Sequence, residues 1–259
     1  MTETKTITES VHVQREGRVA WITLDRPPLN VMDMALLHEL GKVVHHATVE
    51  CDIIVFQGAG PKAFSAGVEV KDHTPDRVGE MLSAFHGVFR QLWRADCLSI
   101  AAVHGHCLGG GAELSTFCDF VIAGESAQFG QPEIKLGCFP PLALVTYPAL
   151  IGPRAAVDLI LTGRTVGAQE AKALGLVTQV VPDAELEPAV QKLIAALNEK
   201  SHVVLRMTRR ALWQRSGLDF ERSLHEAEEL YTKELMRTHD AQEGIRAFIE
   251  KRAPVWQGR

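Results

Sequence analysis

The sequence has no excess of basic residues. Its 259 residues include 27 lysines and arginines against 32 aspartates and glutamates, which gives a formal net charge of −5 at pH 7. A protein that binds a phosphate backbone usually carries a basic stripe, so this balance argues against nucleic acid as a partner. The sequence also lacks an apolar run long enough to span a bilayer, and we expect no membrane association.

Metal and disulfide patterns are missing as well. The sequence has 5 cysteines, at positions 51, 97, 107, 118 and 138. They are too scattered for a C-x-x-C pair, and their odd number predicts free thiols in a reducing compartment. His104 and His106 complete no standard metal spacing with Cys107 and Cys118, so we expect packed side chains and no metal. The first ten residues, MTETKTITES, show no targeting pattern, and we expect a cytoplasmic protein.

Hydrophobic periodicity predicts an α/β fold. Val11–Gln14 and Val19–Leu24 alternate around a Glu-Gly turn, which is typical of a β-hairpin. Short apolar runs further along are typical of strands buried on both faces. These runs are Cys51–Phe56, Ser99–Val103, Asp119–Ala123 and Val177–Val181. They alternate with helical patterns, and this order predicts crossover units in a layered α/β core.

The helical patterns have recognisable starts and stops. Asp33 can cap a helix that runs to about Val49, and Pro148 should end or kink a later one. The expected helices of the core are 33–49, 75–94, a helix after the glycines that runs through 118, 142–150, 155–161 and 168–174. Beyond Pro182 the pattern is helical to about Arg252, with breaks near Ser201, Gly217 and His239. We therefore expect a core domain over 1–200 and a helical region over 201–259.

One stretch, Leu98–Leu142, concentrates chemistry. Three glycines, Gly109–Gly111, lead from a strand pattern into a helix with Glu113 in its first turn. Free N–H groups at such a turn suit an anion, either a phosphate or a developing oxyanion. The phosphate motifs fail, because Cys107 stands where G-x-G-x-x-G needs glycine and no Gly-Lys-Ser/Thr follows. A tight turn without a ligand is the alternative.

Two glutamates, Glu113 and Glu133, follow the glycines. Each could simply be the first-turn acid of a helix, which the helix dipole favours. Together they suggest a general acid and a general base facing one substrate. A Cys107 nucleophile with His106 as its base is a weaker alternative, because neighbours on an extended segment point to opposite faces. Ser65 lacks the leading glycine of a nucleophile elbow.

The run AAVHGHCLGGGAEL at residues 101–114, followed by Cys118-Asp119 and by FGQPE at 129–133, resembles the signature of the enoyl-CoA hydratase (crotonase) superfamily. KAFSAGV at 62–68 resembles the second motif of that superfamily, and the similarity continues through 163–171, 175–177 and 243–252. The resemblance implies a spiral of ββα units. It also implies C-terminal helices that build a homo-oligomer, either a trimer or a dimer of trimers.

The same resemblance implies roles for individual residues. The substrate would be an acyl-CoA thioester, with coenzyme A as part of the substrate and no separate cofactor. Its carbonyl oxygen would sit between the backbone N–H groups of Val68 and Gly110. Glu113 and Glu133 match both glutamates of the hydratase members, which implies addition or removal of water. Contacts with CoA are implied for Ala66, Lys71, Phe248 and Lys251, the last two often across a subunit boundary.

The chain departs from the usual hydratase pattern at Phe139-Pro140-Pro141, where a glycine-rich run is common. Pro141 has no N–H and replaces a glycine that helps to place water or to admit the acyl chain. The variant is similar to that of hydratases of the anaerobic benzoyl-CoA pathway of aromatic catabolism, which hydrate cyclohexa-1,5-diene-1-carbonyl-CoA. The resemblance thus implies that these three residues shape an acyl pocket for a ring.

Other functions stay open on the sequence. A general enoyl-CoA hydratase or isomerase of fatty-acid-type metabolism would use the same motifs, and an isomerase needs only one glutamate. A thioesterase is a further possibility. A non-catalytic relative that binds RNA or protein is the remote alternative, and the net negative charge weighs against it.

Overall fold

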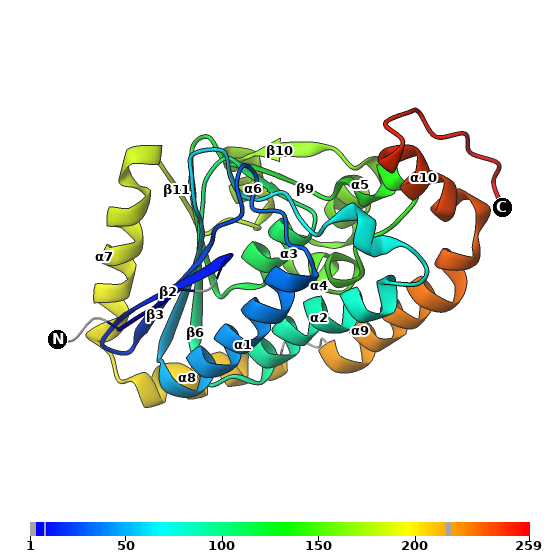
Figure 1. Cartoon of the computed structure of the whole chain (residues 1–259). Helices are drawn as coiled ribbons and strands as arrows, with labels where there is room; N and C mark the ends of the chain where they lie inside the picture. The colour runs from blue at the N-terminus through cyan, green and yellow to red at the C-terminus, as the bar shows by residue number, and fades with distance from the viewer. Residues whose placement is uncertain (1–3, 8, 216–218) are drawn as a thin grey trace.

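The computed structural model describes residues 4–7, 9–215 and 219–259 (Figure 1). Within them, a seven-stranded sheet has the order β1-β2-β3-β4-β6-β8-β11. Its strands are β1 (Thr4–Ile7), β2 (Val11–Glu16), β3 (Val19–Leu24), β4 (Ile53–Gly58), β6 (Leu98–Val103), β8 (Phe120–Gly124) and β11 (Gln179–Val181). β1 to β3 pair antiparallel, which confirms the predicted hairpin, and β3 to β11 pair parallel.

A second, four-stranded sheet in the described chain has the order β10-β9-β7-β5. Its strands are β5 (Ala63–Ser65), β7 (His106–Leu108), β9 (Gln128–Gly130) and β10 (Thr165–Gly167). Each strand is only 3 residues long. Alternation cannot be recognised over so few residues, and the hydrophobic pattern alone did not predict this sheet.

The chain passes repeatedly from the large sheet to the small one and then into a helix. β4 leads to β5, β6 to β7, and β8 to β9, and the helices that follow are α2 (Val78–Arg94), α3 (Gly110–Phe117) and α4 (Pro141–Ile151). Parallel pairing of successive units in both sheets stacks them side by side. The predicted α/β spiral of ββα units is confirmed.

Alternate residues of the large sheet face two different layers. In β4, Ile54 and Phe56 join a core with α2 and with α1 (Met34–Glu50), whose first turn is capped by Asp33 as predicted. Ile53 and Val55 face the other side, where α7 (Leu186–Asn198) covers them. Figure 1 shows α7 on one side of the sheet and α1 and α2 on the other.

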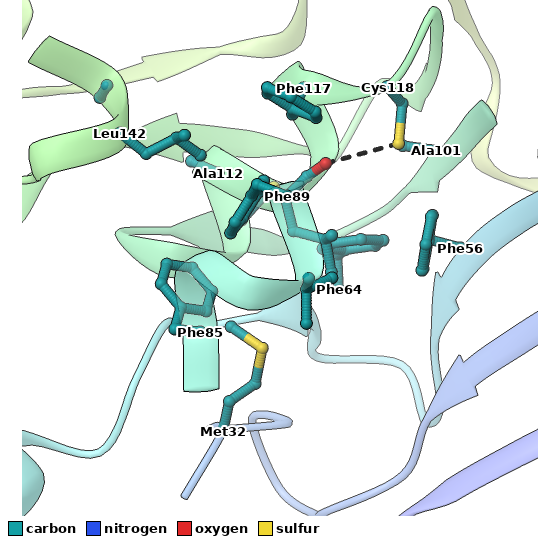
Figure 2. Close-up of a cluster of buried hydrophobic side chains, with 14 of the residues drawn as sticks. Met32, Phe56, Phe64, Phe85, Phe89, Ala101, Ala112, Phe117, Cys118 and Leu142 are labelled. Carbon is teal, nitrogen blue, oxygen red and sulfur yellow. Dashed lines mark hydrogen bonds between the residues drawn. The ribbon is translucent and has the colours of Figure 1, made fainter. Parts of the chain in front are cut away.

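Aromatic side chains fill the larger core, and Figure 2 shows Phe64, Phe85, Phe89 and Phe117 within it. The Phe85 and Phe89 rings meet edge to face at 4.8 Å, and Phe89 meets Phe117 in the same way at 5.2 Å. Edge-to-face pairs of this kind add stability beyond the buried area. They lock α2 against α3, and thereby fix the helix that carries Glu113.

The helices after the core follow the predicted order with small differences. α5 (Pro153–Thr162) and α6 (Ala168–Leu174) are where the pattern predicted them. α4 does not end at Pro148 but continues to Ile151. A proline removes one hydrogen bond, and here only the last turn lies beyond it, so the helix persists. No helix in the described chain is long and apolar enough to cross a membrane.

The C-terminal helices return to the core. They are α8 (His202–Arg215), α9 (Phe220–Glu229), a π-helical turn (Leu230–Glu234), a 3-10 turn (Leu235–Arg237) and α10 (His239–Ile249). The predicted breaks near Ser201 and His239 are confirmed, and the one near Gly217 lies outside the described residues. Phe220 and Leu224 are buried in the same core as α2. The division at residue 200 stays a prediction.

A buried ion pair ties α8 to the sheet. The Asp119 carboxylate accepts hydrogen bonds from the Ser99 N–H and hydroxyl, from the Trp213 indole and from Arg209, at 2.8 to 2.9 Å. Arg209 also donates to the carbonyls of Ala95 and Leu92. The Arg209 and Asp119 side chains are only 7% and 10% exposed, so neither charge can rely on water.

We expect Arg209→Leu to lower the free energy of unfolding by about 3–5 kcal/mol, because it leaves the buried Asp119 carboxylate without its cation. The neighbouring Arg210 pairs with Asp96 where both side chains are about half exposed, at 53% and 51%. Arg210→Leu should therefore change stability by less than about 1 kcal/mol. Urea denaturation of both variants measures the difference, and equal effects would contradict the prediction.

Candidate active site

A cavity of about 440 Å³ lies where the two sequence motifs meet. Its wall combines the segment after β5, the start of α3, helix α2, and the 3-10 helix η2 (Pro132–Leu136) with the start of α4. The π-helical turn and α10 close it from the C-terminal side. Most of the wall is apolar, which makes the cavity a water-poor site for a small ligand.

The first wall depends on glycine. Gly109 has φ of +52°, which L side chains rarely adopt, and it starts the turn into α3. A Cβ on Gly67 would lie 3.2 Å from the Gly110 nitrogen, and a Cβ on Gly111 would lie 2.3 Å from the Ser65 carbonyl oxygen. The two motifs therefore touch through backbone atoms, although they lie more than forty residues apart in the sequence.

Val68 and Gly110 both line this wall. Gly110 is the first residue of α3, where an N–H has no partner within the helix. In the described chain, neither the Val68 nor the Gly110 N–H has a hydrogen-bond acceptor: around Val68, Met32 pairs instead with Gly67 and Glu69. Two free donors on adjoining segments suit an oxyanion, and the helix dipole of α3 adds to the attraction.

Glu113 lies one turn into α3 and is buried. Its Oε1 accepts a hydrogen bond of 2.8 Å from the Ala143 N–H in the first turn of α4. Burial raises the pKa of Glu113 to about 7, against the opposing effect of the N–H groups of Ala143 and Leu142. The anion of Glu113 is thus supported by two backbone N–H groups of α4.

Glu133 comes from η2 and reaches the same wall. Its Oε1 lies 2.6 Å from where a Cβ on Gly109 would be, and its buried Oε2 has no hydrogen-bond partner in the described chain. Burial and the charge of Glu113 raise the pKa of Glu133 to about 8. Because the two carboxyl groups titrate together, we expect the pair to share about one proton near neutral pH.

The proline variant forms the wall next to the glutamates. Phe139, Pro140 and Pro141 line the cavity, and the Phe139 ring meets Tyr231 edge to face at 5.0 Å. Pro141 is the first residue of α4, a position where its missing N–H costs no helix bond. The next N–H groups of α4 then approach Glu113.

The sequence-predicted CoA residues divide into two groups. Ala66 and Phe248 line the cavity. Lys71, in the 3-10 helix η1 (Val70–His73), and Lys251, after α10, are exposed and outside the wall formed by the described residues. The structure brings together Glu113, Glu133, Val68 and Gly110, but the roles assigned to all these residues stay predictions.

The alternative nucleophiles of the sequence analysis are Cys107, with His106 as its base, and Ser65. On β7, His106 is exposed and Cys107 buried, so they do face opposite sides, and burial raises the pKa of the Cys107 thiol to about 12. The buried Ser65 hydroxyl donates to the Asn30 carbonyl and accepts from the Gly67 N–H. In the described chain all five cysteines are free and buried, and no group of three or more His, Cys, Asp or Glu could hold a metal.

The polar residues of the wall that the sequence patterns missed are His86 on α2 and Tyr231 on the π-helical turn, together with His73 and Lys135. His86 hydrogen-bonds to Glu228, which lies 142 residues further along the chain. Neither His86 nor Tyr231 belongs to a local motif. The only signal was a histidine on the apolar face of a predicted helix, which more often indicates a packed side chain.

Comparison with known proteins gives a consistent result. The family model described as enoyl-CoA hydratase/isomerase matches residues 14–259. A cyclohexa-1,5-dienecarbonyl-CoA hydratase of Thauera aromatica is 34% identical over 96% of this chain and 96% of its own length. A probable enoyl-CoA hydratase of Mycobacterium bovis is 38% identical over 97% and 99%. The crystal structure of an enoyl-CoA hydratase from Mycobacterium avium subsp. paratuberculosis is 26% identical, covers 97% of this chain and 100% of its own, and has a TM-score of 0.87.

We expect the buried glutamates to make the protein less stable as the pH rises. Both pKa values are raised above 4.5, so the folded state holds more protons than the unfolded state up to about pH 8. Glu133→Gln removes one buried charge. The free energy of unfolding of this variant, relative to that of the unmodified protein, should therefore be higher at pH 8 than at pH 5. Urea denaturation at pH 5 and at pH 8 measures this difference in the free energy of unfolding. The exposed Glu199→Gln serves as control, and a Glu133→Gln difference independent of pH would refute the prediction.

Proposed function

The chain belongs to the enoyl-CoA hydratase/isomerase family, and from this premise we propose that it adds water to a cyclic dienoyl-CoA, cyclohexa-1,5-diene-1-carbonyl-CoA, in aromatic degradation. That the chain is a hydro-lyase of the enoyl-CoA hydratase type follows from its relatives. The observation that carries the ring substrate is the Phe139-Pro140-Pro141 wall beside the glutamate pair. The relative from Thauera aromatica, named for that substrate, supports it.

The chemistry needs a place for negative charge. When water adds to a thioester-conjugated double bond, charge moves through the conjugated system to the thioester oxygen, whether the acyl group is an alkene or a diene. The N–H groups of Val68 and Gly110 would receive that oxygen. Loss of one such donor in comparable sites costs about 3–4 kcal/mol of transition-state stabilisation. The apolar cavity strengthens the interaction by keeping bulk water out.

The two glutamates divide the proton transfers. Glu113 has the Ala143 N–H to support its anion, so we assign it the removal of a proton from the attacking water. Glu133 has an unpartnered oxygen, and both burial and the charge of Glu113 raise its pKa, so we assign it the delivery of a proton to a carbon of the substrate. The water oxygen bonds to one carbon as its proton goes to Glu113, and the Glu133 proton goes to another carbon. Dehydration runs the same steps in reverse.

A general enoyl-CoA hydratase is the second candidate. It is favoured by the higher identity to the Mycobacterium bovis relative, which is named for that activity. The same donors and glutamates would serve a straight-chain substrate. What separates the two candidates is the shape of the wall at Pro141, which has no N–H and is rigid.

We also propose that the protein acts as a homo-oligomer, a trimer or a dimer of trimers, in the cytoplasm and with no cofactor beyond the CoA of its substrate. Four apolar side chains of α8 are more than half exposed: Val203, Val204, Met207 and Leu212. An exposed apolar cluster of this kind favours burial against another chain. Lys251 is exposed and outside the cavity of its own chain, and we propose that it contacts CoA bound in a neighbouring subunit, as the family resemblance implies.

Glu113→Gln and Glu133→Gln should each lower kcat by about 100-fold or more, because the amide can neither accept nor deliver the proton. Steady-state rates of hydration, followed by the added mass of water, measure this. Glu199→Gln, on the surface at the end of α7, should keep the full rate. A near-normal rate for either buried variant would remove that residue from acid–base catalysis.

Purified protein should bleach the conjugated-thioester absorbance of cyclohexa-1,5-diene-1-carbonyl-CoA and leave crotonyl-CoA nearly untouched, because the Pro141 wall is shaped for a ring. Pro141→Gly should shift the ratio of the two rates towards crotonyl-CoA. Rapid turnover of crotonyl-CoA alone would refute the ring substrate in favour of the general hydratase. A product of unchanged mass would indicate an isomerase, and a free thiol would indicate a thioesterase.

A further inference from the structure

His86 is a polar group in an otherwise apolar part of the cavity wall. It belongs to α2, is 0% exposed, and lines the cavity beside Met81, Leu82 and Phe85. Its Nε2 atom is buried and has no hydrogen-bond partner in the described chain. The proton transfers assigned to Glu113 and Glu133 do not use it. A buried polar atom without a partner is costly, and its retention in a ligand cavity calls for a partner that the ligand brings.

The other ring nitrogen of His86 is held firmly. Nδ1 lies 2.7 Å from the Glu228 carboxylate, which also accepts a hydrogen bond of 2.7 Å from Arg90. Burial opposes ionisation of Glu228, but the hydrogen bonds from His86 and Arg90 lower its pKa to about 2. The carboxylate is therefore charged and can only accept, so Nδ1 must carry the hydrogen.

The charge balance decides the state of Nε2. Arg90 pairs with Glu228 and, at 3.6 Å, with Glu221, which also pairs with Arg94. These two cations and two anions balance, so a protonated His86 would add one net positive charge where its side chain is 0% exposed. Burial accordingly lowers the pKa of His86. A neutral ring with its hydrogen on Nδ1 presents a lone pair at Nε2. The cavity wall thus contains a residue with a fixed, unpartnered hydrogen-bond acceptor, which suits a hydroxyl group and does not suit another carbonyl.

We propose, on the premise of the acyl-CoA function given above, that His86 determines specificity: its Nε2 accepts a hydrogen bond from a hydroxyl group carried by the acyl part of the substrate. Glu228 and Arg90 are positioning residues that hold the ring in the accepting tautomer. The cyclic dienoyl-CoA proposed above carries no such hydroxyl, so a hydroxylated acyl-CoA thioester is a further substrate class for the same site. This hydroxyl is separate from the one that hydration adds, which forms at the glutamates.

Benzoyl-CoA and its three monohydroxy isomers test this, because their aromatic rings resist hydration and report binding alone. Calorimetric titration of the whole protein should show at least one hydroxybenzoyl-CoA binding about tenfold more tightly than benzoyl-CoA, the gain expected for one hydrogen bond to a preformed partner. His86→Leu should remove the preference. His86→Gln should restore part of it, because its amide offers a donor to Glu228 and an acceptor to the ligand.

His225→Gln is the matched control, since His225 is exposed on α9 and outside the cavity. It should leave the preference unchanged. If no hydroxybenzoyl-CoA binds more tightly than benzoyl-CoA to the unmodified protein, or if the preference survives in His86→Leu, the proposal is wrong. The unmodified protein and His86→Gln decide the question if His86→Leu does not fold.

Hydration assays on the same preparation keep the two proposals apart. Hydration of an enoyl-CoA or dienoyl-CoA without any preference among the benzoyl esters would overturn only the role of His86. A preference that depends on His86, with no hydration of any substrate, would overturn the hydratase function and leave the binding role standing.

Discussion

The active site depends on a contact between two backbone segments where there is room only for hydrogen. Gly111 packs against the Ser65 carbonyl, and Gly67 packs against the nitrogen of Gly110. The Ser65 hydroxyl braces this contact by joining the Asn30 carbonyl to the Gly67 N–H. Two N–H donors from separate ββα units are therefore held in register by main-chain contacts and by the Ser65 hydroxyl. In the proposed function, a donor site built in this way would need no reorganisation when charge develops on the substrate.

The second constraint is the burial of two carboxyl groups side by side. Burial alone would leave both protonated at neutral pH, and neither could then act as a base. The first turn of α4 separates them, because two of its N–H groups support the anion of Glu113, whereas Glu133 has only its own backbone N–H. Pro141 fits this arrangement, since it starts α4 without a helix bond to lose and leaves the following N–H groups free for Glu113.

The sequence predicted the parts that depend on local pattern. The hairpin, the cap at Asp33, the long strands and the acids at 113 and 133 were all readable from spacing or from resemblance. Other parts could not be read. A strand of three residues, such as Ala63–Ser65, has no period to recognise. The bond between His86 and Glu228 joins residues 142 positions apart, and only the folded chain brings them together.

The local sequence patterns and the long-range contacts correspond to two different parts of the cavity wall. The donors and acids come from the segments that follow β5, β7 and β9, where short-range motifs and glycine contacts leave little freedom. The remaining wall comes from α2, the start of α4 and the C-terminal helices, where side chains such as His86, Phe139 and Tyr231 meet through tertiary packing. Substitutions in this second part can change the shape and polarity of the acyl pocket without moving the backbone donors. The reaction type is therefore the better determined property of this fold, and the acyl group must be sought in the packing around α2.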